Sequence, residues 1–443
     1  MRCRQHLHGA WAWLACGMET VFIGESSQWG GYREERLSIP DRRHHIAIFG
    51  QTGVGKSTLL KSLILQDIRA GRGCAILDPH GDLATELLDY IPRHRIDDVV
   101  FFDPANRAFA PGLNLLSAVA PDERYRVAED IVAVFGAIWG LSTETTPRLL
   151  YILINTVAAL MDVPNGATLL GVPRMLVDTG YRRWVVRHTR NPTVRRFWQM
   201  EFEEWPERMR LEATAAVLNK AELLISSPVL HNVLGQVKPT IRAEDVLENG
   251  KIFIANLSKG LLGETSAQLF GALLVTSFDL AARKRAGIPE EDRRDFALYA
   301  DEFQNFATDR FASLLSEARK YRFSRTLATQ YTAQLPEAIR AAIFGNVGTL
   351  ISFRVGDDDA TVLSRTFHPW PPAVLRDLGR GEVVLRRLED GLTRDPVLAR
   401  TRQDAWPRVD RSDNIRRQSN RRYTKPRSVV EHKLFSWLGF VGD

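Results

Sequence analysis

Residues 50–58 read Gly50-Gln51-Thr52-Gly53-Val54-Gly55-Lys56-Ser57-Thr58 and match G-x-x-x-x-G-K-[ST] at every fixed position. A short apolar run at 45–49 precedes this stretch, and apolar residues at helical spacing follow it from 59 to 70. A strand, a glycine-rich loop and a helix in that order bring backbone N–H groups and the positive end of a helix dipole to one place. The pattern therefore predicts a nucleoside triphosphate site, and a glycine-rich turn that binds nothing is the ordinary alternative.

Two side chains of this loop have predicted roles. The ammonium group of Lys56 is expected to reach the β- and γ-phosphates, and the hydroxyl of Ser57 is expected to ligate Mg²⁺. The whole run 50–58 is expected to contact the nucleotide.

The composition limits the class of protein. The chain has 443 residues, 44% of them hydrophobic, so it can form one large core and a second domain. Its three cysteines lie far apart and without metal-ligand spacing, which predicts a reduced, cytosolic compartment. No apolar run approaches the roughly 20 residues that cross a bilayer. The run 9–17 is short for a signal peptide, and Met18 is an alternative start.

The order of the strand and helix patterns predicts an α/β fold. Strand and helix signals alternate in residues 41–120 and 247–399, which implies a mostly parallel sheet flanked by helices. Residues 121–246 carry helical patterns alone and are expected to form an inserted all-α domain. Its helices are expected at 124–139, 147–161, 175–188, 194–202 and 211–225. Residues 1–40 are expected to be an N-terminal extension and residues 400–443 a basic C-terminal tail.

The positive charge is concentrated in that tail. Residues 400–434 contain eleven Lys and Arg against four Asp and Glu, although the whole chain has a net charge of only +6. Within this segment, the run 416–427 has few core-forming residues, so this run is expected to be disordered on its own. Clustered arginines suit the phosphate backbone of a nucleic acid, and they equally suit a solvated tail.

A pair of carboxylates follows the apolar strand predicted at 296–300. In P-loop ATPases the first carboxylate of such a pair, here Asp301, holds Mg²⁺, and the second, here Glu302, polarises the attacking water. The strand direction brings both to the carboxyl edge of the sheet, where open α/β folds bind ligands. By itself an apolar strand that ends in Asp-Glu is also common on protein surfaces.

Two further polar residues are candidates for the same site. Gln330 follows the strand predicted at 325–328, where an amide can contact the γ-phosphate or orient water, or can simply be satisfied in a loop. Arg319 ends the helix after the carboxylates. Its planar fork suits the phosphate of a neighbouring subunit's nucleotide, but cations are also favoured at any helix C-terminus.

Taken together, these segments resemble the HerA–FtsK superfamily of ring ATPases, most of all the type IV secretion coupling proteins of the TraG/TraD kind. The resemblance covers about residues 35–390. It rests on the segments 49–58, 77–82 (Leu-Asp-Pro-His-Gly-Asp), 299–304 (Tyr-Ala-Asp-Glu-Phe-Gln), 317–321, 328–330 and 345–354.

The resemblance implies a RecA-like P-loop domain in a ring, usually a hexamer, that hydrolyses ATP with Mg²⁺ and moves DNA through its channel. By that match Lys56 and Ser57 are Walker A, Asp301 and Glu302 are Walker B, and Gln330 is the γ-phosphate sensor. Arg319 becomes the arginine finger that acts in trans, with Arg354 as a second candidate.

The implied partners are DNA, single-stranded or relaxase-linked, and type IV secretion components. Membrane-bound coupling proteins begin with transmembrane helices, and no such run occurs here. The expected location is therefore cytoplasmic, with peripheral recruitment to the inner membrane by partners. Two alternatives remain: a HerA-like DNA translocase in repair or mobile-element maintenance, and a substrate receptor whose ATPase is vestigial.

Overall fold

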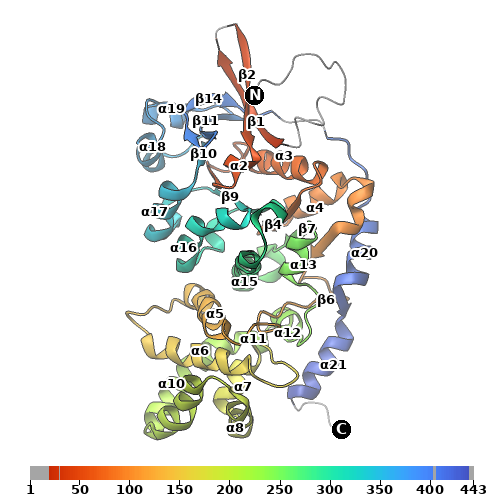
Figure 1. Cartoon of the computed structure of the whole chain (residues 1–443), viewed down its shortest axis with the longest axis vertical. Helices are drawn as coiled ribbons and strands as arrows, with labels where there is room; N and C mark the ends of the chain where they lie inside the picture. Colours follow the sequence, from red (N-terminus) through yellow and green to blue (C-terminus); the bar gives the residue numbers. More distant parts are fainter. Residues whose placement is uncertain (1–18, 29, 403–405, 439–443) are drawn as a thin grey trace. The chain divides into compact units, whose positions relative to one another are not determined.

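The computed structural model describes residues 19–28, 30–402 and 406–438 (Figure 1). Most of the segment around the two candidate start residues therefore lies outside the described residues. The chain divides into two compact units. The first unit comprises Met1–Val100, Val246–Ala255 and Ala281–Ile415, and the second comprises Phe101–Asp245, Asn256–Leu280 and Arg416–Asp443.

An eleven-stranded sheet has the order β2-β1-β14-β11-β10-β3-β9-β8-β4-β7-β5. Its strands are β1 (Thr20–Gln28), β2 (Gly31–Ser38), β3 (Ile46–Phe49), β4 (Gly73–Asp78), β5 (Val99–Phe102), β7 (Ile252–Asn256), β8 (Phe296–Ala300), β9 (Phe323–Thr329), β10 (Thr349–Ser352), β11 (Glu382–Arg386) and β14 (Val397–Arg400). A two-residue hairpin, β12 (Leu388–Glu389) and β13 (Leu392–Thr393), forms a separate ladder.

The middle of the sheet is parallel. β10, β3, β9, β8 and β4 pair in parallel, and every residue of these five strands is buried. Parallel strands with helices on both faces are largely apolar, and β3 and β8 were readable as continuous apolar runs for this reason. β9 and β10 also bury Ser and Thr side chains, and β9 buries one Arg. Their carboxyl ends lie at one edge and collect the loops that follow β3, β8 and β9. The predicted α/β class is confirmed.

The other end of the sheet is antiparallel, which the sequence did not predict. β1 pairs with β2 and β14, and β11 pairs with β14 and β10, all antiparallel. The expected N-terminal extension thus contains a hairpin of two strands. Residues 31–34 of β2 are exposed and largely polar, so the strand carries no core-facing pattern there.

The first unit has its helices around the sheet (Figure 1). They are α2 (Ile39–Arg42), α3 (Lys56–Arg69), α4 (Asp82–Leu87), α16 (Asp309–Glu317), α17 (Glu337–Asn346), α18 (Asp357–Ser364) and α19 (Pro372–Asp377). Three more helices, α13 (Ala243–Glu248), α15 (Glu264–Lys284) and α20 (Ser412–Tyr423), contribute residues to both units.

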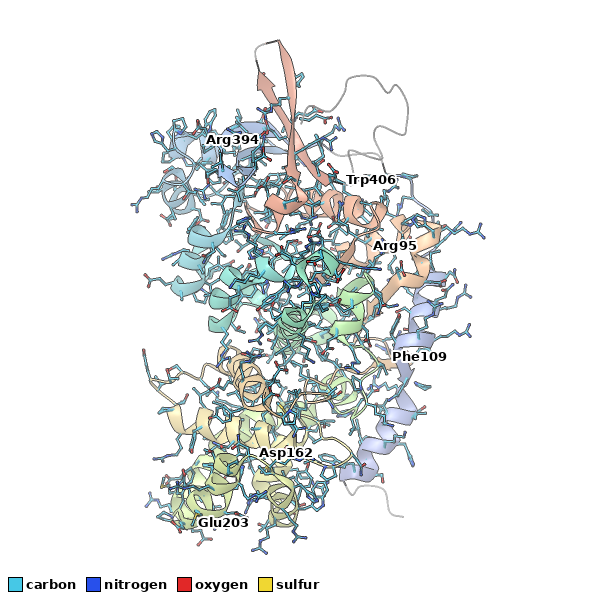
Figure 2. All side chains as sticks on the ribbon, in the orientation of Figure 1. Arg95, Phe109, Asp162, Glu203, Arg394 and Trp406 are labelled. Carbon is cyan, nitrogen blue, oxygen red and sulfur yellow. The ribbon has the colours of Figure 1, made fainter. Side chains whose placement is uncertain are left out.

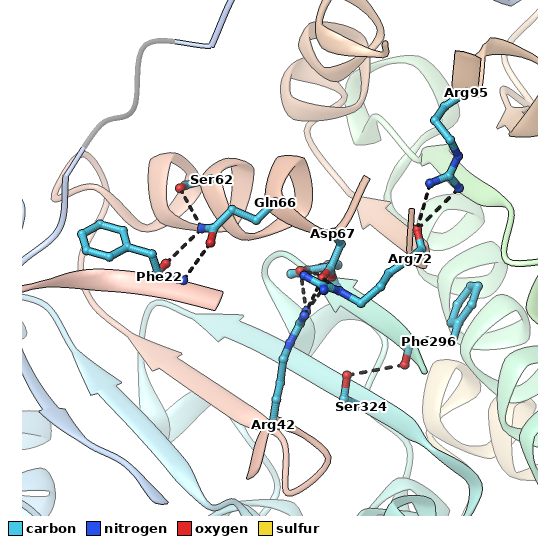
Figure 3. Close-up of polar contacts among 10 residues, drawn as sticks. Phe22, Arg42, Ser62, Gln66, Asp67, Arg72, Arg95, Phe296 and Ser324 are labelled. Atoms are coloured by element: carbon cyan, nitrogen blue, oxygen red, sulfur yellow. Dashed lines mark hydrogen bonds and ion pairs between the residues drawn. The ribbon is translucent and has the colours of Figure 1, made fainter. Parts of the chain in front are cut away.

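Helix α3, which follows the glycine-rich loop, is anchored at its C-terminal end by a buried ion cluster (Figure 3). Asp67 accepts hydrogen bonds from Arg42 at 2.7 Å, Arg72 at 2.7 Å and the Tyr299 hydroxyl at 2.6 Å. Burial alone raises the pKa of Asp67, but the charges of Arg42 and Arg72 outweigh it and lower that pKa to about 2. The cluster ties α3 to α2 and to β8.

The second unit is mostly helical. Its helices are α5 (Arg124–Trp139), α6 (Pro147–Leu160), α7 (Gly171–Val177), α8 (Thr179–His188), α9 (Pro192–Arg196), α10 (Glu207–Ala221), α11 (Leu223–Ser226), α12 (Pro228–Leu234), α14 (Lys259–Leu262) and α21 (Arg427–Leu438). An aromatic cluster of Phe197, Trp198, Phe202 and Trp205 packs in its core. Glu203, labelled in Figure 2, pairs with Arg182 and Arg210.

The run 416–427, which was expected to be disordered on its own, is folded in this structure because it packs against other segments of the chain. Strand β15 (Thr424–Pro426) pairs with β6 (Phe109–Pro111), and α20 and α21 flank it. Sparse apolar side chains of these helices are buried, among them Val430 and Leu434. The Phe101 N–H donates to Ser419 Oγ at 2.8 Å. The segment folds because it has partners in the second unit, although its own composition is poor in core residues.

One helix is long and apolar enough to cross a membrane. In the part of the chain that the structure describes, residues 264–287 pass by length and composition, and 78% of their apolar window is buried. Burial of this kind is what a core helix of a folded domain shows.

Candidate active site

The glycine-rich loop joins β3 to α3, as the sequence predicts. Gly53 and Gly55 have φ angles of 79° and 122°, in the region that favours glycine, and Gly55 immediately precedes α3. The loop is fixed to neighbouring strand ends by backbone hydrogen bonds. The Gln51 N–H donates to the carbonyl of Arg354 at 2.9 Å, and the carbonyl of Val54 accepts from the Gly381 N–H at 3.0 Å. Thr52, Gly53 and Ser57 are exposed to solvent, so this part of the loop is accessible to a ligand.

Lys56 lies inside the curve of this loop. Its side chain is only 6% exposed, and its ammonium group donates to the carbonyls of Gly50 and Gln51. Nζ is 3.9 Å from Oε1 of Glu302. Burial lowers the pKa of Lys56, while the charges of Glu302 and Asp301 act in the opposite direction. The arrangement keeps a positive charge at the point where the loop would surround phosphates.

Asp301 and Glu302 follow β8 and are both buried. Ser57 Oγ donates to Asp301 Oδ2 at 3.3 Å, so the two predicted Mg²⁺ ligands are neighbours. Burial, with the charges of Glu302 and Asp78, raises the pKa of Asp301 to about 6. Such crowding of carboxylates disfavours their ionised forms unless cations compensate. Lys56 is one compensating cation, and a divalent ion between Ser57 and Asp301 fits as a second.

The carboxylate of Glu302 is held by two amides. Gln330 Nε2 donates to Oε1 at 2.8 Å, and Gln304 Nε2 donates to Oε2 at 2.6 Å. Gln304 is itself oriented by the Thr329 hydroxyl, which donates to its Oε1 at 2.8 Å. Glu302 has a φ angle of 46°, an uncommon conformation for a non-glycine residue. Backbone and side chain together therefore fix where this carboxylate points.

Gln304 had no role in the sequence prediction. It is part of the Asp-Glu-Phe-Gln run after β8, and the two-residue spacing from Glu302 was the only signal available. The short turn Phe303–Asn305 returns the amide to Glu302. A pairing of this kind is not readable from a sequence that gives no turn geometry.

A cavity of about 330 Å³ adjoins the two metal-binding candidates and is lined by Ser57, Thr58, Asp78, Asp301 and Trp406, among others. Asp78, at the end of β4, accepts from the N–H groups of His80 and Ala84, both at 2.9 Å, which fixes its carboxylate. Trp406, labelled in Figure 2, lies under the Arg69 guanidinium at 4.4 Å. Sequence reasoning assigned no role to Trp406, which is remote in the chain.

The structure brings together five of the predicted residues: Lys56, Ser57, Asp301, Glu302 and Gln330. The two candidate finger residues, Arg319 and Arg354, are not part of this cluster. Arg319 lies in the turn Ala318–Tyr321 after α16, and its side chain is exposed. The Arg354 side chain, after β10, is also exposed. Within the described chain neither guanidinium forms a hydrogen bond or ion pair with the five clustered residues.

Two family models match the chain. One, described as "Helicase HerA, central domain", matches residues 37–275. The other, described as "TraM recognition site of TraD and TraG", matches residues 295–366. No curated protein matches the sequence.

Several solved structures share the fold. The unbound bacterial conjugative coupling protein TrwBdeltaN70 has a TM-score of 0.61 at 13% identity, over 88% of this chain and 91% of that chain. TrwB in complex with ADP and Mg²⁺ has a TM-score of 0.60 at 14% identity, over 84% and 88%. VirB4 of Thermoanaerobacter pseudethanolicus has a TM-score of 0.58 at 14% identity, over 88% and 97%. The predicted RecA-like fold is confirmed.

Proposed function

The chain belongs to the family of the central domain of helicase HerA, and we propose that it is an ATP-hydrolysing motor that feeds substrate to a type IV secretion apparatus. Its resemblance to the TraG/TraD coupling proteins of the HerA–FtsK superfamily supports this proposal. The observation that carries this proposal is the fixed carboxylate of Glu302. It lies 3.9 Å from the Lys56 ammonium and is clamped by Gln330 and Gln304.

The site residues have separate tasks in this proposal. The loop 50–58 and Lys56 bind the phosphates. Ser57 and Asp301 would hold Mg²⁺, which would supply positive charge beside the phosphates. Glu302 orients the attacking water and accepts its proton. Its two oxygens keep lone pairs free beyond those that the amides occupy. Gln330 connects Glu302 to the position of the γ-phosphate.

The proposed assembly is a ring, usually a hexamer in the superfamily, that moves DNA. Arg319, exposed and separate from the cluster, would complete the nucleotide site of a neighbouring subunit, with Arg354 as the second candidate. The proposed partners are DNA, single-stranded or relaxase-linked, and type IV secretion components. Recruitment to the inner membrane would then depend on those components. The proposed domain division remains that of the sequence: 41–120 with 247–399, and the insertion 121–246.

A second candidate function is a HerA-like DNA translocase outside secretion. The match of residues 37–275 to the helicase HerA central domain favours it. The match of residues 295–366 to the TraD and TraG model favours secretion. A receptor with a vestigial ATPase is disfavoured, because Lys56, Asp301 and Glu302 are all present and close together.

Phosphate release by the purified full chain, with ATP and Mg²⁺, tests the motor. Hydrolysis that rises on addition of DNA supports a DNA motor. Hydrolysis that does not respond to single- or double-stranded DNA would argue for another substrate. The absence of hydrolysis would favour the alternative of a substrate receptor with a vestigial ATPase. Binding of type IV secretion components encoded by neighbouring genes separates secretion from repair.

A further inference from the structure

A groove of about 560 Å³ lies in the second unit, away from the residues of the nucleotide site. Helix α21 contributes one wall. The other lining residues come from the segments 163–168 and 235–238, from α7 and α8, and from Lys425 of β15. Much of the lining is aliphatic. Val237 and Val429 are 39% and 44% exposed, so apolar surface in this groove meets solvent. An accessible apolar groove of this size is typical of a binding site.

The charge around the groove is of one sign. Lys238, Lys425 and Lys433 line it, and no carboxylate does. Within the described residues, none of the three ammonium groups has a carboxylate partner, and Lys425 Nζ reaches only the carbonyl of Lys238, at 3.4 Å. Burial, followed by the charges of Lys433 and Lys238, lowers the pKa of Lys425. The positive charge of these lysines is therefore not compensated by groove carboxylates, and a negatively charged ligand could compensate it.

The acidic side chains nearby are already engaged. Glu431, on α21, accepts from Arg427 at 2.7 Å and from Asn232 at 3.0 Å. Asp178 accepts from the backbone N–H of Tyr181 at 2.9 Å and from Arg174 at 3.3 Å. Neither carboxylate is among the groove residues.

The cation–aromatic group at one end of the groove is also internally satisfied. The Arg174 guanidinium lies 4.7 Å from the Tyr181 ring and 4.8 Å from the Trp437 ring, and it donates to the Trp437 carbonyl at 2.9 Å. Trp184 stacks on Tyr181 at 5.9 Å. These contacts leave no free arginine fork for a nucleotide. The open features are the aliphatic wall, the lysines and part of the Trp184 ring, which is 39% exposed.

We propose that this groove docks an acidic segment of a partner protein, with an apolar side chain against Val237 and Val429 and carboxylates beside Lys238, Lys425 and Lys433. An apolar anchor surrounded by complementary charge is the usual composition of a specific peptide interface. The proposal does not depend on the nucleotide site or on what the motor moves.

Fluorescence anisotropy with the full chain and a labelled peptide of Glu, Leu and Phe tests the site. Binding is expected at low salt and is expected to weaken as salt rises. Lys433→Glu is expected to weaken it about tenfold, equivalent to about 1.4 kcal/mol. Val429→Asp should do the same through the apolar wall. Both side chains are exposed, so circular dichroism and ATP hydrolysis should be unchanged.

Arg421→Glu is the matched control, because it reverses an exposed charge on α20 that is not among the groove residues. It should leave peptide affinity as it was, and a peptide with Lys in place of Glu should not bind. Failure of the acidic peptide to bind up to about 1 mM would reject the proposal. Equal loss in Lys433→Glu and Arg421→Glu would also reject it. An oligothymidylate that binds more tightly than the peptide, and whose binding Val429→Asp abolishes, would show that the ligand of the groove is nucleic acid rather than an acidic peptide.

Discussion

The side-chain amide of Gln330, at the end of β9, donates a 2.8 Å hydrogen bond to Oε1 of Glu302, at the end of the neighbouring strand β8. Gln304 holds the other carboxylate oxygen from the following turn. Any ligand contact that moves Gln330 therefore changes the hydrogen bonding of Glu302 directly. In the proposed mechanism this single contact would link phosphate sensing by Gln330 to water activation by Glu302.

Glu302→Gln is expected to lower the rate of ATP hydrolysis by about 10²–10⁴-fold, because the amide cannot accept a proton from water. Nucleotide affinity should persist, since the loop, Lys56, Ser57 and Asp301 are untouched. Lys56→Ala should instead abolish nucleotide binding or turnover. Equilibrium binding of a fluorescent ATP analogue, together with phosphate release, distinguishes the two. Normal turnover by Glu302→Gln would show that another group activates water.

Gln304→Ala is expected to lower kcat by about 10–100-fold, the range seen when a group that orients a catalytic ligand is lost. Nucleotide affinity should stay unchanged. Thr329→Val removes the hydroxyl that orients Gln304 and should cause a smaller loss in the same direction. Steady-state kinetics for both variants provide the check. A Gln304→Ala enzyme with wild-type kcat would mean that Gln330 alone suffices to hold Glu302.

Arg319 is expected to act across subunits, so hydrolysis per chain should rise steeply with protein concentration. Arg319→Ala and Glu302→Gln chains should each be inactive alone and should recover activity when mixed. A mixed interface can pair an intact Glu302 with an intact Arg319. Co-assembly is verified by differential tags. If co-assembled rings stay inactive, Arg319 is not the finger, and Arg354→Ala is tested in the same way.

Arg417 and Arg421 are exposed on α20, and we expect them to contact DNA phosphates if the basic segment binds DNA. Replacing each by Gln should reduce the log–log salt dependence of DNA binding by roughly 0.7–0.9 per lost contact. ATP hydrolysis without DNA should not change. Arg208→Gln, at an exposed position of α10, serves as the control. If Arg417→Gln and Arg421→Gln have the same slope as Arg208→Gln, α20 contacts protein or solvent rather than DNA.

Because His45 is buried, we expect the free energy of unfolding to fall in acid. Burial, followed by the Arg325 charge, lowers its pKa to about 3, and its Nδ1 accepts from the Arg325 N–H at 3.1 Å. Between pH 6.5 and 3 the unfolded chain binds a proton that the native state excludes. The free energy of unfolding should therefore fall as the pH falls, by about 1.4 kcal/mol per pH unit from this group.

Urea denaturation at a series of pH values measures that slope. His45→Asn is the comparison, because Asn tolerates the left-handed backbone at this position, where φ is 69°. In His45→Asn the slope of the free energy of unfolding against pH, between pH 6.5 and 3, should be smaller by the contribution of one proton. An unchanged slope would mean that His45 is protonated in the native state.

The parallel strands and most helices of the insertion were predictable because they rest on local patterns. Strands such as 46–49 and 296–300 are continuous apolar runs, and α5 begins and ends where its helical spacing does. The hairpin β1–β2 was missed because half of β2 faces solvent and carries charged residues. The predicted domain boundaries stay a prediction, since compactness groups some of these residues differently.

The site was predictable to the extent that a residue's role follows from its own motif. Lys56, Ser57, Asp301 and Glu302 belong to two such motifs. The motifs meet because β3 and β8, which flank β9, run parallel and end at the same edge of the sheet. Gln304 was not predictable in the same way, because its role depends on a turn and on the Thr329 hydroxyl of another strand. The order of α20 and α21 depends on distant partners such as Phe101 and was equally hidden.

Both edge strands of the large sheet, β2 and β5, carry features that oppose pairing with a further strand. At β5 the Phe101 N–H is taken by Ser419, and at β2 the charged residues Arg33, Glu34 and Arg36 occupy the border. Unpaired borders recruit strands from other copies and lead to aggregation, and charge or a covering helix prevents this. We therefore expect any assembly of copies of this protein to form through side-chain surfaces, and such an assembly could exchange or rotate subunits without breaking a shared ladder of hydrogen bonds.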